Sequence, residues 1–158
     1  MIHTTLCYIE KDGKYLMLHR IKKQNDINRD KWIGIGGKFE EGETPSDCVL
    51  REVKEETGLT LNKYKYRGEI LFCPDTPIEE TMHLFTADGF TGEVISDCPE
   101  GKLEWISKTD LLKIPMWEGD KIFLNLIQNE NQPFFKLTLC YDGDKLVKAL
   151  LNGKELSI

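Results

Sequence analysis

One segment constrains the fold of this chain more than any other: the strongly predicted helix between Thr44 and Gly58. Thr44 can cap its N-terminus, Pro45 suits the first helical position, and Asp47 completes a capping box. Gly58 supplies the C-terminal stop. Because its apolar residues fall on one stripe, this helix must bury that stripe against another layer. The stripe comprises Cys48, Val49, Val53 and Leu59.

The rest of the chain favours a mixture of strands and short helices. Runs of apolar, β-branched and aromatic residues predict strands over residues 4–10, 14–20, 32–35, 61–72, 82–90, 103–106, 134–141 and 145–151. A polar loop is expected at 22–31, a brief helical turn at 110–112 and a second, more apolar helix at 121–127. Two well-separated helices among mixed strands predict an α/β (α+β) fold, an α/β sandwich with a mixed β-sheet rather than a doubly wound sheet.

Length and composition indicate a single domain spanning residues 1–158. A chain of this size buries roughly 70% of its unfolded surface, which suffices for an independent core. There is no internal repeat and no Pro/Gly/Ser-rich linker. No apolar run approaches the length of a bilayer span, and the N-terminus lacks a signal-peptide pattern. We therefore expect a cytoplasmic protein without a membrane partner, either a monomer or a homodimer.

The charge balance narrows the possible partners. With 27 acidic and 21 basic residues the net charge is −6, so a nucleic-acid polymer would be repelled. A small anionic molecule stays possible because a bound divalent cation reverses the local sign of charge.

The cysteines predict neither a disulfide framework nor a zinc site. They are odd in number and form no CxxC pair, so we expect buried thiols. The five are Cys7, Cys48, Cys73, Cys98 and Cys140.

Three glutamates on the predicted helix suggest chemistry. Glu52, Glu55 and Glu56 are spaced i, i+3 and i+4, so their carboxylates share one helix edge about 5–6 Å apart. Each pair repels by about 3 kcal/mol at an effective dielectric constant near 20. A hard divalent cation with a preference for oxygen ligands would remove this repulsion. The alternative is a solvated acidic face balanced by Arg51 and Lys54.

A glycine-rich loop precedes the helix. It runs from Gly36 to Glu43 with the sequence GGKFEEGE, and its glycines allow the backbone to approach a ligand closely. Lys38 lies in this loop and is a candidate contact for a phosphate oxygen.

Loop and helix together resemble the signature of the Nudix hydrolase family. The chain matches every defined position of the Nudix box, GX5EX7REUXEEXGU. Gly37 is followed after five residues by Glu43, and after seven more residues by the segment REVKEETGL. The match covers residues 37–59. It implies the family's α/β/α sandwich and a metal-dependent hydrolysis of a diphosphate linkage.

The resemblance also implies roles for the box residues. Glu52, Glu55 and Glu56 become ligands of Mg²⁺, with Mn²⁺ as a possible substitute, helped by a backbone carbonyl at Gly36 or Gly37. Arg51 and Glu43 are then expected to orient these ligands through hydrogen bonds.

The proton of the attacking water requires a base. Glu55, Glu56 or an acidic residue on a later loop can accept it. Glu100 is the candidate on that loop, with Asp97 as the alternative. An exposed turn residue is the competing interpretation of Glu100.

More distant residues bear on the substrate. Trp117 and Asp120 resemble the base-binding segment of the MutT-type branch, which hydrolyses oxidised purine nucleoside triphosphates. Two positions depart from that branch: Gly119 replaces a first aspartate and Ile33 replaces an asparagine. Both changes remove polar groups that read the base, which weakens selectivity for one base edge. Trp117 can equally be a core aromatic.

Several other residues are candidates for the substrate pocket. Phe72 and Ile33 would form its second wall, while Lys23, with Arg20 and Lys22, would meet the phosphates; a solvated loop is the alternative for these three. His83 alternates on a predicted strand and is expected to be a packed or surface histidine rather than a catalyst.

The first choice of reaction is hydrolysis of 8-oxo-dGTP to the monophosphate and pyrophosphate. Other Nudix substrates remain as alternatives: a nucleotide sugar, a dinucleoside polyphosphate or a capped RNA end. A non-catalytic nucleotide-binding module is the alternative from another class, although such modules commonly lose a box glutamate and this chain retains all three.

Overall fold

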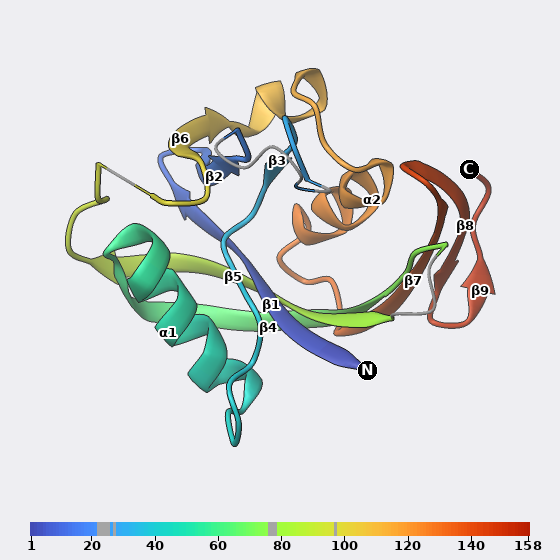
Figure 1. The fold of residues 1–158 in the computed structure, drawn as a ribbon, viewed down its shortest axis with the longest axis horizontal. Coiled ribbons are helices and arrows are strands. Elements are labelled where there is room, and N and C mark those ends of the chain that lie inside the picture. Colours follow the sequence, from blue (N-terminus) through green and yellow to red (C-terminus); the bar gives the residue numbers. More distant parts are fainter. Residues whose placement is uncertain (22–25, 27, 76–78, 97) are drawn as a thin grey trace.

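The structure is a computed structural model that describes residues 1–158 except 22–25, 27, 76–78 and 97 (Figure 1). Two α-helices and one 3-10 helix occur in the described part of the chain: α1 (Pro45–Thr57), η1 (Lys108–Lys113) and α2 (Glu118–Ile127). The strands are β1 (Ile2–Lys11), β2 (Lys14–His19), β3 (Trp32–Ile33), β4 (Thr60–Cys73), β5 (Glu80–Thr91), β6 (Lys102–Ser107), β7 (Phe135–Asp142), β8 (Lys145–Leu151) and β9 (Lys154–Glu155).

All described strands belong to one mixed sheet. Its order is β3-β2-β1-β5-β4-β7-β8-β9, and β6 pairs with β2. The pairs β1–β5 and β4–β7 are parallel, while the other pairs are antiparallel. The two parallel pairs bring the N-terminal strand and the C-terminal hairpin into the centre and one side of the same sheet (Figure 1).

The two helices cover opposite faces of this sheet. Alternate residues of β1 show the division, because side chains point to opposite faces along a strand. Cys7 and Ile9 join the core that includes Val49 and Val53 of α1, whereas Leu6 and Tyr8 join the core beneath α2. The predicted α/β/α sandwich is therefore confirmed.

Helix α1 begins and ends as its sequence predicts. The Thr44 side chain accepts a hydrogen bond from the Asp47 amide at 3.1 Å, and the Asp47 carboxylate accepts one from the Thr44 amide at 3.1 Å. Gly58 adopts φ 82°, a left-handed conformation that favours glycine. All four residues of the predicted apolar stripe are fully buried.

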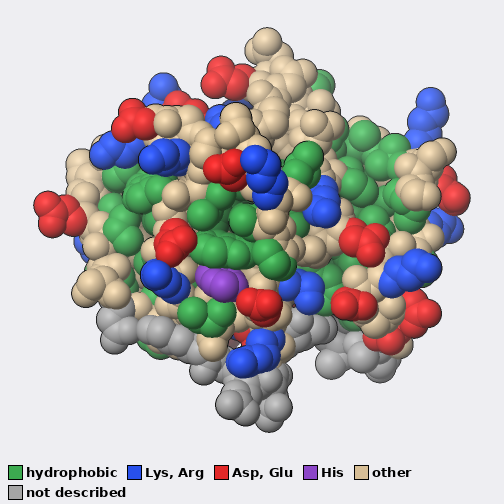
Figure 2. All heavy atoms as spheres, turned by 90° about the horizontal axis from the view of Figure 1, so that it is seen from above, with side chains coloured by type: hydrophobic (Ala, Val, Ile, Leu, Met, Phe, Trp, Pro, Cys, Tyr) green, Lys and Arg blue, Asp and Glu red, His purple; other side chains and the backbone are tan. Residues whose placement is uncertain are grey.

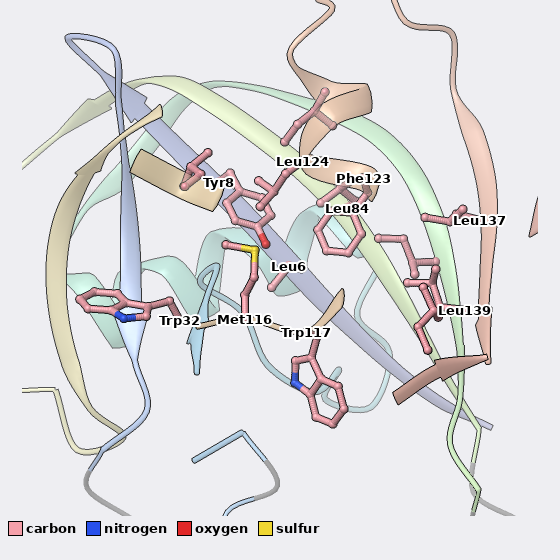
Figure 3. Close-up of a cluster of buried hydrophobic side chains, with 14 of the residues drawn as sticks. Leu6, Tyr8, Trp32, Leu84, Met116, Trp117, Phe123, Leu124, Leu137 and Leu139 are labelled. Carbon is pink, nitrogen blue, oxygen red and sulfur yellow. The ribbon is translucent and has the colours of Figure 1, made fainter. Parts of the chain in front are cut away.

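Helix α2 packs the second face. Phe123 and Leu124 reach from it into a cluster of buried side chains, and Trp117, just before the helix, lies at one end of this cluster (Figure 3). The helix begins at Glu118 rather than at the predicted 121, since the polar residues at its start have no apolar periodicity to mark them.

Two other boundaries differ from the prediction. Strand β3 ends at Ile33, and Ile35 forms only an isolated bridge with Cys7. The chain there runs close to β1: a Cβ on Gly36 would lie 1.8 Å from the Thr5 carbonyl oxygen, so only glycine fits. The short edge strand β9 was not predicted, because two residues are too few to show a pattern.

Apolar side chains also occur on the surface above β6 and η1. In Figure 2 this face shows a central group of hydrophobic side chains bordered by charged ones. Leu112, in η1, is 72% exposed. Within the described residues, no helix is both long and apolar enough to cross a bilayer.

Truncating Phe123 tests the core beneath α2. Phe123→Ala should lower the free energy of unfolding by about 3–5 kcal/mol, because it leaves a cavity in a fully buried cluster. Leu112→Ala is the exposed control and should change stability by less than about 0.5 kcal/mol. Urea denaturation of the three proteins measures both effects, and equal losses in the two variants would contradict this assignment of the core.

Candidate active site

The acidic edge of α1 faces the glycine-rich loop. Glu52 and Glu56 are largely buried there, whereas the Glu55 side chain is 57% exposed. A Cβ on Gly37 would lie 2.5 Å from the Glu52 carboxylate, so the glycine lets this side chain lie directly against the loop backbone. The helix edge and the loop thus form one continuous surface of oxygen atoms.

Arg51 ties the loop to the helix. Its Nε and Nη2 donate to the two carboxylate oxygens of Glu43, each at 2.8 Å, and Nη2 also donates to the Lys38 carbonyl at 3.0 Å. The guanidinium lowers the pKa of Glu43 to about 2, so this pair is ionised at neutral pH. These contacts fit the expected orienting role of Arg51 and Glu43.

Arg51 also contacts the glutamate cluster itself. Its Nη1 donates to Glu52 at 2.7 Å and to Glu55 at 3.2 Å. In this arrangement no three histidine, cysteine or acidic side chains of the described residues converge as a ready metal site. The three glutamates nevertheless offer carboxylate oxygens, which are the ligands that a hard divalent cation prefers. The Gly37 carbonyl accepts a hydrogen bond from the Thr5 amide at 2.9 Å.

Glu56 lies deepest in the cluster. Its carboxylate accepts a hydrogen bond from the Gly36 amide at 3.3 Å. Burial, together with contact with the Glu100 carboxyl group, raises the pKa of Glu56 well above its usual range. Glu100 is held in turn by Arg20 at 3.4 Å. The structure therefore brings Glu100 to the cluster, as the sequence suggested, while Asp97 lies outside the described residues.

One pocket lies next to this cluster, although none of the three box glutamates lines it. It starts at the loop backbone beside Glu52 and ends between α2 and the strands. Its lining includes Gly36, Gly37, Ile33, Phe72, Trp117 and Asp120. All four residues that the sequence singled out for the base therefore line the same pocket.

Trp117 is held firmly in the pocket wall. Its Nε1 donates to Asn28 at 2.6 Å, and the Lys31 ammonium lies 4.6 Å from the ring centroid. Phe72 and Tyr141 meet the ring edge-on, with centroids at 5.8 and 5.1 Å. Trp117 is thus both a core aromatic and a pocket residue, the two interpretations that its sequence position allowed.

Asp120 is the one carboxyl group buried at the α2 end of this pocket. Burial raises its pKa to about 8, against a smaller lowering by Lys31. At neutral pH most of its population is therefore protonated, so the group can donate one hydrogen bond and accept another.

Several pocket residues were missed by the sequence, among them Thr4, Glu80 and Tyr141. Glu80 lies opposite Phe72 in the β4–β5 register and accepts a hydrogen bond from the Thr4 hydroxyl at 2.8 Å. Tyr141 fills the space beside Gly119: its hydroxyl accepts from the Gly119 amide at 2.8 Å, and a Cβ there would lie 2.6 Å from it. Glu80 lies two residues before the predicted strand 82–90, and no local pattern marks Glu80, Thr4 or Tyr141 as a pocket residue.

Other candidates lie away from the pocket. The Lys38 side chain is exposed and does not line it. Arg20 is engaged by Asp26 at 2.7 Å as well as by Glu100, and Lys22 and Lys23 lie outside the described residues. His83 is a packed histidine as expected, 7% exposed and 3.1 Å from His3.

The buried Asp120 gives the metal-free protein a defined pH dependence. Its folded pKa of about 8 exceeds the unfolded value of about 4, so the folded state binds more protons between these values. The contribution of Asp120 to the free energy of unfolding is fully present below about pH 4. It is lost as the pH rises toward 8, and the free energy of unfolding then falls by at most about 1.4 kcal/mol per pH unit. Denaturation in EDTA between pH 5 and 9 should therefore show a shallower decline for Asp120→Asn. Parallel curves for the two proteins would contradict a neutral Asp120.

Comparisons with known proteins agree with this geometry. The family model of the NUDIX domain matches residues 3–127. An uncharacterised Nudix hydrolase of Bacillus subtilis, YvcI, is 35% identical over 127 residues, 78% of this chain and 77% of its own length. The oxidized purine nucleoside triphosphate hydrolase of Danio rerio is 32% identical over 128 residues, with coverage of 78% and 77%. The crystal structure of a MutT protein from Bacillus halodurans superposes with a TM-score of 0.87 at 28% identity, covering 98% of this chain and 99% of that one.

The family match covers the loop, α1 and α2, and so includes the acidic edge and most of the pocket. The chain therefore belongs to the Nudix family in its MutT-type form, whose members are hydrolases that act on pyrophosphate bonds of nucleotide derivatives.

Proposed function

We propose that this chain uses Mg²⁺ to hydrolyse a purine nucleoside triphosphate to the monophosphate and pyrophosphate, and that 8-oxo-dGTP is the first choice of substrate. One observation carries the proposal: a single pocket runs from the loop backbone beside the box glutamates to Trp117 and Asp120. A nucleotide laid along it would have its phosphates at the acidic edge and its base at the α2 end. Such a substrate is a small molecule of the cytoplasm.

The acidic edge would serve the phosphate end. Glu52, Glu55 and Glu56, with a carbonyl of Gly36 or Gly37, would hold the cation, and Arg51 would keep the loop and α1 in register. A bound Mg²⁺ offsets phosphate charge and lowers the pKa of an attacking water. Glu100, which contacts Glu56, would take the proton of that water.

The α2 end would read the base. A protonated Asp120 offers a donor and an acceptor side by side, which matches a purine edge that carries an adjacent acceptor and donor. Glu80 would offer a further hydrogen-bond acceptor. It lines the same pocket and is the register partner of Phe72 on the neighbouring strand. Since Lys31 covers one face of Trp117, a base would stack against the remaining surface of that ring.

Another Nudix substrate is the main alternative. Ile33 presents no polar group to the pocket, and Tyr141 occupies the space beside Gly119. The polar groups that would bind one purine edge therefore differ from those of the oxidised-purine branch. A nucleotide sugar, a dinucleoside polyphosphate and a capped RNA end are accordingly kept as alternative substrates. A substrate panel that measures pyrophosphate against monophosphate release separates these reactions.

Removing charge from the acidic edge tests the chemistry. Glu55→Gln and Glu56→Gln should each lower kcat by about a hundredfold or more with the fold intact, because each loses an anionic oxygen ligand. Glu100→Gln should lower kcat by about 10²-fold while Mg²⁺ affinity is kept. Glu93→Gln, on an exposed turn, is the control and should leave turnover unchanged. Near-normal turnover in both Glu55→Gln and Glu56→Gln would refute the site.

The protonation of Asp120 makes a second prediction, on specificity. Asn also presents a donor beside an acceptor, so Asp120→Asn should keep kcat/KM for 8-oxo-dGTP within about tenfold, whereas Asp120→Leu should lose about a hundredfold. Steady-state kinetics with 8-oxo-dGTP and dGTP, measured by pyrophosphate release, give both numbers. If Asp120→Asn lowered kcat/KM as much as Asp120→Leu, the carboxylate would act as an anion and the prediction would be wrong. If neither triphosphate were hydrolysed, the substrate assignment would be wrong.

A further inference from the structure

Two cysteines lie side by side in the sheet. Cys73 ends β4 and Cys140 lies in β7, and the two are direct register partners in the parallel β4–β7 pair. Side chains of register partners point to the same face of the sheet. The two thiols are therefore neighbours, and the Cys140 side chain adds to burial in raising the pKa of Cys73.

The spacing of the two backbones suits a disulfide. Neighbouring strands lie about 4.7–4.9 Å apart, within the range of about 4.4–6.8 Å that separates the Cα atoms of a disulfide. A bridge there requires rotation of two side chains and no rearrangement of the sheet.

These two thiols also differ from the other cysteines in accessibility. Cys7, Cys48 and Cys98 are buried, as expected. Cys73 and Cys140 are partly exposed, so the expectation that all five thiols would be buried was wrong for these two. A small oxidant can therefore reach this pair. Burial and the neighbouring sulfur raise the pKa of Cys73 to about 11, which keeps its thiol protonated and makes the first oxidation step slow.

We propose that Cys73 and Cys140 form a reversible disulfide when the protein meets hydrogen peroxide. One sulfur attacks a peroxide oxygen and becomes a sulfenic acid with release of water. The second sulfur then displaces the hydroxyl group as another water, and the S–S bond forms. Two thiols and one peroxide give one disulfide and two waters, so electrons and atoms balance.

The bridge would lie directly behind the wall of the pocket. Cys73 follows Phe72 and Cys140 precedes Tyr141, and the rings of Phe72 and Tyr141 both line the pocket with centroids 5.1 Å apart. Oxidation would fix the spacing of β4 and β7 at this point. This modification site does not depend on which nucleotide is hydrolysed.

Thiol counting on the folded, full-length protein tests the proposal. After treatment with hydrogen peroxide and alkylation in denaturant, three of the five cysteines should be labelled, and all five after dithiothreitol. Peptide mass mapping should show a Cys73–Cys140 cross-link. The oxidised protein should also unfold at a Tm equal to or higher than that of the reduced protein, since the bridge closes a long loop without straining the sheet.

Serine variants supply the controls. Cys73→Ser and Cys140→Ser should each abolish the internal cross-link, while Cys98→Ser, at a buried site on another segment, should leave it intact. Five labelled thiols after peroxide, a cross-link between other cysteines, irreversible oxidation of one thiol alone, or a lowered Tm of the oxidised protein would each overturn the proposal.

Discussion

The bonds made by the Arg51 guanidinium hold the acidic site together. Like-charged carboxylates on one helix edge repel, and a cation close to them offsets that cost. Arg51 supplies this cation within the chain: it joins Glu43 and the Lys38 carbonyl on the loop to Glu52 and Glu55 on the helix. Arg51 thus bonds the glycine loop to the capped helix, while β1 holds the same loop through the Thr5 amide and the Gly37 carbonyl.

The parts of the fold with strong local signals could be predicted from the sequence. The capping box, the buried stripe and the Gly58 stop placed α1 correctly, and alternating apolar runs placed eight of the nine strands. The box glutamates were equally clear, because their chemistry depends on spacing within one helix and the loop before it. The start of α2 and the two-residue β9 escaped, since neither carries a periodic pattern.

The walls of the pocket could be predicted only in part. Trp117 and Asp120 were found by resemblance and Phe72 as a candidate for the second wall, yet their surroundings depend on contacts between distant segments. Trp117 is bonded to Asn28 across most of the chain, and Tyr141 reaches Gly119 from the C-terminal hairpin. Likewise, the position of Cys73 beside Cys140 follows from the parallel pairing of β4 and β7, which no single segment encodes.

The place of Tyr141 in this arrangement has a consequence for how such a protein can change over evolutionary time. The family match ends at residue 127, whereas Tyr141 belongs to β7 beyond it. One wall of the pocket is therefore contributed by a segment that takes no part in the acidic cluster. Substitutions in that hairpin can therefore change the shape of the pocket without altering any residue of the acidic cluster, so the two parts of the molecule can diverge independently.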